Sequence, residues 1–83
     1  MNKSLETIIK ELPKSVSCPQ HCELEIKTWD HCGNVWVGYS NRFADKYPKP
    51  CYFGKDIVKG IRQLHKGIKE LEKKGLITCH YYE

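Results

Sequence analysis

The chain has 83 residues, a mass of 9.7 kDa and a formal net charge of +4, and 40% of its residues are hydrophobic and 29% charged. A chain of this length buries only ~60–65% of the surface that it exposes when unfolded, which leaves room for one hydrophobic core and excludes a multidomain enzyme. The composition also excludes a disordered, a collagen-like and a transmembrane chain.

The first residues predict a short helix followed by a loop. Asn2 or Ser4 can cap this helix, and Pro13 ends it after about three turns. Its apolar positions, at three- and four-residue spacing, are Leu5, Ile8, Ile9 and Leu12. Residues 13–21 are rich in proline and serine and predict a loop. Because charged residues interrupt the apolar stretch, it cannot serve as a secretory signal, and we expect a cytoplasmic protein.

Residues 22–39 predict a β-hairpin. Apolar and polar residues alternate over 22–29, and a second β-rich run covers 35–39. If Cys32 and Gly33 are the two central residues of the turn, the pairs across the hairpin are Ile26–Tyr39, Thr28–Val37 and Trp29–Trp36. This register places both tryptophans opposite each other on the face away from the core candidates, with open space beside them at Gly38.

The second half of the chain predicts a long helix between two short strands. Residues 41–50 have the composition of an exposed loop, and residues 51–53 can form a third strand. The helix starts near Asp56, where a carboxylate suits the helix dipole, and ends at Gly75. Residues 76–82 predict a last strand. We therefore expect a single α+β domain over residues 1–83, in which a long amphipathic helix packs on one face of a small antiparallel sheet, made of the hairpin and the C-terminal strand, with a short N-terminal helix.

The long helix has two opposite faces. At roughly 100° per residue, its apolar core face consists of Ile57, Ile61, Leu64, Ile68 and Leu71. The opposite face, called here the basic ridge, consists of Lys55, Lys59, Arg62, Lys66, Lys69 and Lys73. Residues 55–74 carry the whole net charge, and few acidic residues are spaced to pair with the ridge. The ridge is therefore either a solvated face or a surface that docks on phosphates or on an acidic protein.

Gly60 and Gly67 lie seven residues apart on one flank of this helix, where each glycine costs ~1 kcal/mol relative to alanine. We expect the helix backbone to pack closely on the sheet at these positions. Close approach of a partner is the alternative.

Trp29 and Trp36 form a second candidate surface. Exposed tryptophans are enriched at protein-binding hot spots and also stack on nucleic-acid bases. The alternative is that the N-terminal helix or the C-terminal residues cover this face.

Cysteines and histidines raise the question of a metal site. The candidates are Cys18, His21, Cys22, His31, Cys32, Cys51, Cys79 and His80. Cys18 and Cys22 lack a second close-spaced pair, which structural zinc sites usually have, and the predicted hairpin places Cys22 and Cys32 ~30 Å apart. We expect no metal and no cofactor. Five cysteines is an odd number, and without a secretory signal it favours five free thiols.

The sequence contains no pattern that predicts catalysis. Cys79 and His80 are neighbours in a predicted strand, so their side chains point to opposite faces and cannot form a nucleophile–base pair. The pair His31–Cys32 lies at a turn tip without a pocket. Gly54-Lys55-Asp56 lacks the glycine spacing and the hydroxyl of a phosphate loop. We expect no catalytic residue and no enzymatic activity.

Three resemblances to known families bear on function. The segment from Glu23 to Glu72 resembles the core of HicB-type antitoxins. It contains Val35-Trp36-Val37-Gly38-Tyr39-Ser40 at the end of the hairpin, then a loop, Gly54 and an amphipathic helix, but it lacks the acidic, proline-flanked loop of those proteins. The order helix, strands, basic helix is similar to a double-stranded-RNA-binding domain, without its Lys-Lys motif. In size and single-domain form the chain resembles small phage-encoded proteins that block host or defence machinery, such as anti-CRISPR proteins.

These observations leave three hypotheses. In the first, the protein is a non-enzymatic inhibitor that binds and blocks nucleic-acid-processing machinery through the basic ridge, the tryptophan pair or both. In the second, it is a nucleic-acid-binding module that uses the ridge alone. In the third, it is a zinc-stabilised structural domain. We expect no membrane partner, and the oligomeric state stays open.

Overall fold

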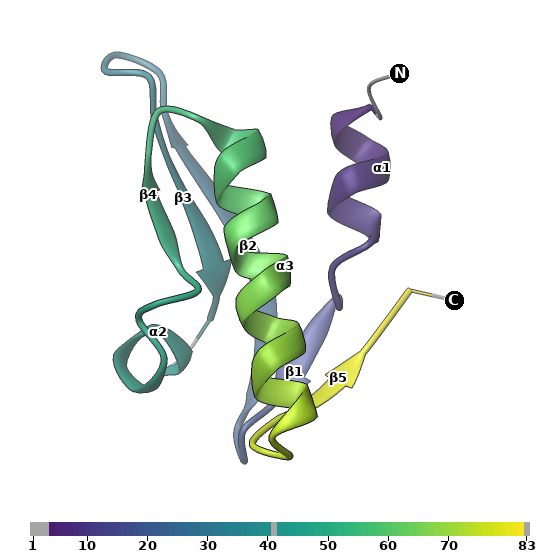
Figure 1. Ribbon diagram of the computed structural model, residues 1–83. Coiled ribbons are helices and arrows are strands. Elements are labelled where there is room, and N and C mark those ends of the chain that lie inside the picture. The colour runs from purple at the N-terminus through teal and green to yellow at the C-terminus, as the bar shows by residue number, and fades with distance from the viewer. Residues whose placement is uncertain (1–3, 41, 83) are drawn as a thin grey trace.

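The computed structural model describes residues 4–40 and 42–82 as five strands and three helices. In chain order these are α1 (Leu5–Lys10), β1 (Ser15–Ser17), β2 (His21–Trp29), β3 (Asn34–Tyr39), α2 (Phe43–Lys46), β4 (Tyr52–Gly54), α3 (Ile57–Lys73) and β5 (Thr78–His80). The strands form one antiparallel sheet in the order β4-β3-β2-β1-β5. Helix α3 lies across one face of this sheet with α1 packed beside it, so the predicted α+β fold is confirmed (Figure 1).

Helix α3 begins and ends at the predicted residues. The Asp56 side chain caps it by accepting a hydrogen bond from the Lys59 N–H at 3.1 Å. At the other end Gly75 adopts φ +75°, and the N–H of Leu76 donates to the carbonyl of Leu71 at 3.0 Å, which closes the last turn. The predicted core face is confirmed, because its central residues Ile61, Leu64 and Ile68 are buried, while Ile57 and Leu71 are half-buried.

The hairpin has a different register from the predicted one. Strands β2 and β3 pair Ile26 with Val37, Thr28 with Val35 and Trp29 with Asn34, a slip of two residues. The turn spans residues 30–33 instead of two residues, and Gly33, at φ +70°, donates its N–H to the Trp29 carbonyl at 2.8 Å. Because a slip of two residues keeps every side chain on its face, the core residues were assigned correctly, but the prediction that Trp29 faces Trp36 directly is wrong.

Two further elements lie where the sequence predicted loops. Residues 13–21 contain β1, whose central residue Val16 is fully buried and which pairs with both β2 and β5. Residues 41–50 contain α2, whose Phe43 is fully buried against Tyr39, with ring centroids 5.3 Å apart. The strand predicted at residues 51–53 is confirmed as β4. The C-terminal strand exists but is shorter than predicted, and α1 has only six residues.

The core lies between the sheet and the two helices α1 and α3. Its buried hydrophobic residues are Ile8, Leu12, Val16, Cys18, Cys22, Val37, Tyr39, Phe43, Ile61, Leu64, Ile68 and Ile77. The Tyr39 hydroxyl, which is buried among them, donates a hydrogen bond to the Pro13 carbonyl at 2.6 Å. None of the helices in the described part of the chain is both long and apolar enough to cross a membrane.

Candidate functional site

The basic ridge of α3 is exposed along its whole length. All six predicted cations, Lys55, Lys59, Arg62, Lys66, Lys69 and Lys73, lie at the surface. The ion pairs between described residues are Lys10–Glu6, Lys27–Glu25 and His21–Glu23, and none of them involves α3. Within residues 4–40 and 42–82, the ridge therefore presents cations that no carboxylate within 4.0 Å neutralises.

Part of the ridge lines a groove that the sequence did not predict. Two adjoining hollows share Gln63 and Lys66: one of about 570 Å³ lies along α3 alone, and one of about 540 Å³ runs between α3 and residues 46–50. Cations from both sides line this basic groove, namely Lys59, Arg62, Lys66 and Lys74 from α3 and its C-cap, and Lys46 and Lys49 from α2 and the loop. Two carboxylates, those of Asp56 and Glu70, also line it. Lys55, Lys69 and Lys73 belong to the ridge but not to the groove.

Two contacts fasten the loop to α3 and so form the groove. The Gln63 side-chain amide donates hydrogen bonds to the carbonyls of Lys49 at 3.1 Å and Cys51 at 3.2 Å. Gly67 approaches Pro50 so closely that a Cβ at this position would overlap the proline ring. These contacts therefore hold the backbone of residues 49–51 against α3.

The helix glycines serve close packing, as predicted. A Cβ at Gly60 would lie 2.6 Å from Cδ2 of Tyr52, which comes from β4, and Gly67 is in contact with the loop before that strand. The two glycines thus seat one flank of α3 on β4 and on the chain leading into it. The sequence feature that indicates the groove is Gly67, which makes room for Pro50. It could not be recognised from the sequence, because the segment that packs on Gly67 was not known.

The face of the sheet opposite α3, called here the outer face, carries an aromatic cluster. The rings of Trp29 and Phe53 meet edge to face with centroids 5.7 Å apart, and Lys27 Nζ lies 5.4 Å from the Trp36 ring centroid. Trp29 is 36% and Phe53 61% exposed. The open space predicted at Gly38 is absent, because the Trp36 ring occupies it.

The predicted alternative, in which α1 covers the tryptophans, is wrong. Helix α1 packs against α3 on the inner face of the sheet (Figure 1). Phe53 was missed as a member of the cluster, because its contact with Trp29 depends on the pairing of β3 with β4, which brings Phe53 opposite Trp36.

The five cysteines do not gather at one place. Cys18 and Cys22 have sulfurs 3.7 Å apart beside the β1–β2 turn, whereas Cys32 is exposed in the hairpin turn and Cys51 and Cys79 are half-buried elsewhere. The described residues contain no group of three or more His, Cys, Asp or Glu side chains arranged to hold a metal ion. The expectation that no metal binds stays a prediction.

Burial raises the pKa of two of these thiols well above neutrality. It raises the pKa of the Cys22 thiol to about 11, with the neighbouring Cys18 as a second cause. It also raises the pKa of the Cys79 thiol to about 11, with Glu72 as a second cause. Both groups therefore remain protonated at neutral pH, and the predicted separation of Cys79 from His80 holds, since His80 faces Ser17 across the β1–β5 pair.

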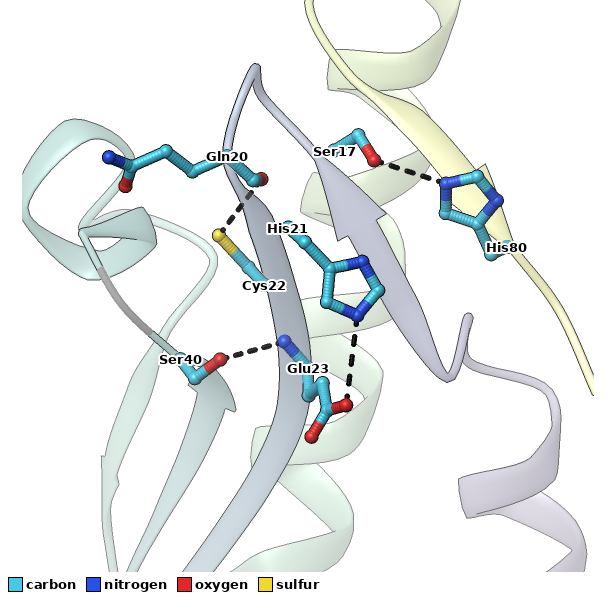
Figure 2. A network of polar contacts seen from close by, with 7 residues as sticks. All are labelled: Ser17, Gln20, His21, Cys22, Glu23, Ser40 and His80. Atoms are coloured by element: carbon cyan, nitrogen blue, oxygen red, sulfur yellow. Dashed lines mark hydrogen bonds and ion pairs between the residues drawn. The ribbon is translucent and has the colours of Figure 1, made fainter.

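A short polar network lies on the outer face where β1, β2 and β5 meet (Figure 2). The Ser17 hydroxyl lies 3.1 Å from His80 Nε2, and His21 Nε2 lies 3.7 Å from a carboxylate oxygen of Glu23. The Ser17 hydroxyl and the His80 imidazole resemble the nucleophile and the base of a catalytic triad without the carboxylate that orients the base. However, Glu23 contacts His21 and not His80, and the site lies on an exposed strand pair, so this network lacks the oriented base that nucleophilic catalysis uses.

Comparison with protein-family models, with curated proteins and with solved structures finds no match to this chain.

Proposed function

We propose that this protein is a non-enzymatic binding protein that docks its basic groove on the phosphate backbone of a nucleic acid. The observation that carries the proposal is that Lys66 and Lys74 from α3 and its C-cap line one hollow together with Lys46 and Lys49 from the opposite side, and that Lys59 and Arg62 extend it along α3. If the ridge were only a solvated face of α3, nothing would bring cations from another segment beside it. A groove with cations on both walls fits a chain of phosphates, whose negative charges are contacted from two sides.

The site gives this binding an electrostatic, sequence-independent character. Lysine and arginine side chains neutralise phosphates and release condensed counterions, so affinity falls steeply as salt rises. Four phosphates contacted by the groove correspond to a log–log slope of about −3.6 on duplex DNA, and contacts from all groove cations except Lys46, whose ammonium donates to the Cys18 carbonyl, correspond to about −4.5. The amide of Gln63 is already committed to the loop carbonyls, so the groove offers few groups for reading bases.

Charge reversal at matched positions tests the proposal. Arg62→Glu with Lys66→Glu reverses two groove cations, whereas Lys55→Glu with Lys69→Glu reverses two ridge cations outside the groove and changes the net charge equally. Binding to a fluorescent 20-bp duplex is measured over a range of salt concentrations. We expect the groove variant to lose affinity and about two units of salt slope, and the ridge variant to keep most of its binding. Equal losses would assign binding to bulk charge, and no binding by the parent protein would refute the proposal.

A second candidate function is inhibition of nucleic-acid-processing machinery by direct protein binding. The exposed pair Trp29 and Phe53 favours it, since exposed aromatic residues are enriched at hot spots of protein interfaces. An inhibitor of this kind also matches the resemblance to small phage-encoded proteins. It predicts weak salt dependence and a large loss on Trp29→Ala, because apolar burial is little screened by salt. A pull-down with and without nuclease separates the two functions, since a partner held through nucleic acid disappears after digestion.

A further inference from the structure

The pair Cys18 and Cys22 has an arrangement that neither the basic groove nor the aromatic cluster uses. Their sulfurs lie 3.7 Å apart, which is van der Waals contact, and both thiols point to the carbonyl of Gln20, at 4.0 Å from Cys18 and 3.5 Å from Cys22. Figure 2 shows the Cys22 thiol directed at this carbonyl. The two residues flank the β1–β2 turn, whose pairing of Ser17 with His21 holds them in place.

We propose that Cys18 and Cys22 are an oxidisable dithiol that forms an intramolecular disulfide when the protein meets a peroxide. Bond formation requires the sulfurs to approach by roughly 1.7 Å, from contact to the S–S distance of ~2.05 Å. A change in side-chain torsion at the turn can supply a movement of this size. All five cysteines are described, and no other pair among them has sulfurs in contact, so the disulfide is specific to this turn.

A surface hollow gives small oxidants access to the pair. Its volume is about 370 Å³, and besides the two cysteines it is lined by Pro19, Gln20, Arg42, Phe43, Asp45 and Lys46. Two of these lining residues are cations, and Lys46 Nζ is fixed there by a hydrogen bond of 3.2 Å to the Cys18 carbonyl. The thiolate is the form of a cysteine that reacts with peroxide.

The reaction proceeds in two steps that balance. Cys18, 8% exposed against 1% for Cys22, attacks one oxygen of hydrogen peroxide as its thiolate, which gives a sulfenic acid and hydroxide. Cys22 then attacks the Cys18 sulfur, the S–O bond breaks, and the oxygen leaves as water with the proton lost by the Cys22 thiol. In total, two thiols and one peroxide give one disulfide and two waters.

Peptide mapping of the oxidised wild-type protein tests this proposal. The folded protein is treated with hydrogen peroxide, quenched in acid, alkylated in denaturant and digested with trypsin. Cleavage after Lys14 and Lys27 leaves both cysteines in one peptide, residues 15–27. We expect the mass of this peptide to fall by two hydrogen atoms and the peptide to carry no alkyl group. Cys51 and Cys79 should be alkylated in the same sample. A reductant added before alkylation should restore two alkyl groups on peptide 15–27.

Two variants sharpen the result. Cys22→Ser removes the resolving thiol, so peptide 15–27 should then end as a sulfinic acid or an alkylated Cys18 and never as a disulfide. Cys51→Ser, a half-buried cysteine without a sulfur neighbour, should oxidise like the wild type. Two results would show that the pair is only a packing contact and that the proposal is wrong. In the first, peptide 15–27 of the wild-type protein still carries two alkyl groups after peroxide has oxidised the exposed Cys32. In the second, Cys18 is oxidised to a sulfinic acid while Cys22 remains a thiol.

Discussion

The hydroxyl of Tyr39 and the carbonyl of Pro13 form a hydrogen bond of 2.6 Å in the core. Tyr39 is the last residue of β3, an interior strand of the sheet, and Pro13 lies in the short connection between α1 and β1. Both residues are fully buried, so no water can replace either partner. Burial also raises the pKa of the Tyr39 hydroxyl far above its usual range, which keeps it a donor at any pH at which the protein folds.

Removing this hydroxyl should be costly. Tyr39→Phe leaves the Pro13 carbonyl buried without a partner, and we expect the free energy of unfolding to fall by ~1–3 kcal/mol in a urea titration. Tyr82→Phe, at an exposed tyrosine, is the matched control and should change stability by less than ~0.5 kcal/mol. Equal effects of the two substitutions would show that the buried hydrogen bond does not contribute.

The two faces of α3 should respond differently to truncation. Leu64 is fully buried, and Leu64→Ala should lower the free energy of unfolding by ~2–5 kcal/mol, a large part of the stability of a domain this small. Lys66 is exposed in the groove, and Lys66→Ala should change it by less than ~0.5 kcal/mol. Chemical denaturation of both variants is the measurement, and similar losses would contradict the assignment of the helix faces.

Gly67 should not tolerate a side chain. Helix propensity alone predicts that Gly67→Ala stabilises an exposed helix by ~1 kcal/mol. Here the new Cβ would overlap Pro50, so we expect a loss of ~1–3 kcal/mol instead, together with weaker binding by the displaced groove loop. Thermal denaturation of the variant decides the sign, and a rise in melting temperature would mean that the loop does not pack on α3.

Stability should decline in alkaline solution. The folded pKa of about 11 for Cys22 and for Cys79 lies above the ordinary thiol pKa of 9.0, so between these values the folded state holds protons that the unfolded state has released. Stability is thus fully present below pH 9 and falls as the pH rises towards 11. Urea titrations across this interval should show the decline, and Cys22→Ala should make it shallower. A stability that does not change with pH in this interval would contradict the burial of these thiols.

The sequence predicted the elements that periodicity specifies and missed those that depend on tertiary contacts. The core face of α3 follows from five apolar residues at helical spacing, and it is correct. By contrast, β1 is a Ser-Val-Ser segment with one apolar residue, and it becomes a strand because β2 and β5 pair with it from both sides. The hairpin register failed for a related reason, since a turn of four residues and one of two give the same alternation of faces.

Only the part of the candidate site that lies on α3 was predicted, because helical periodicity specifies it. Three of the six ridge cations line the basic groove, and they were identifiable from helix geometry alone. Lys46 and Lys49 lie in a segment without periodicity, and their place beside α3 depends on Gln63, Gly67 and Pro50, contacts between residues 12–17 positions apart. Such contacts become visible only after the loop has been placed.

The order of the strands also bears on the behaviour of the protein at high concentration. Both edge strands, β4 and β5, contain three residues, and the nine-residue strand β2 pairs with β1 over residues 21–23 and with β3 over residues 24–29. Exposed edges with long rows of unpaired N–H and C=O groups are templates for aggregation between chains. The edges at β4 and β5 offer only short stretches of backbone, whereas residues 25–29 of β2 have a paired strand on one side only, so an incoming strand would find its longest template on β2.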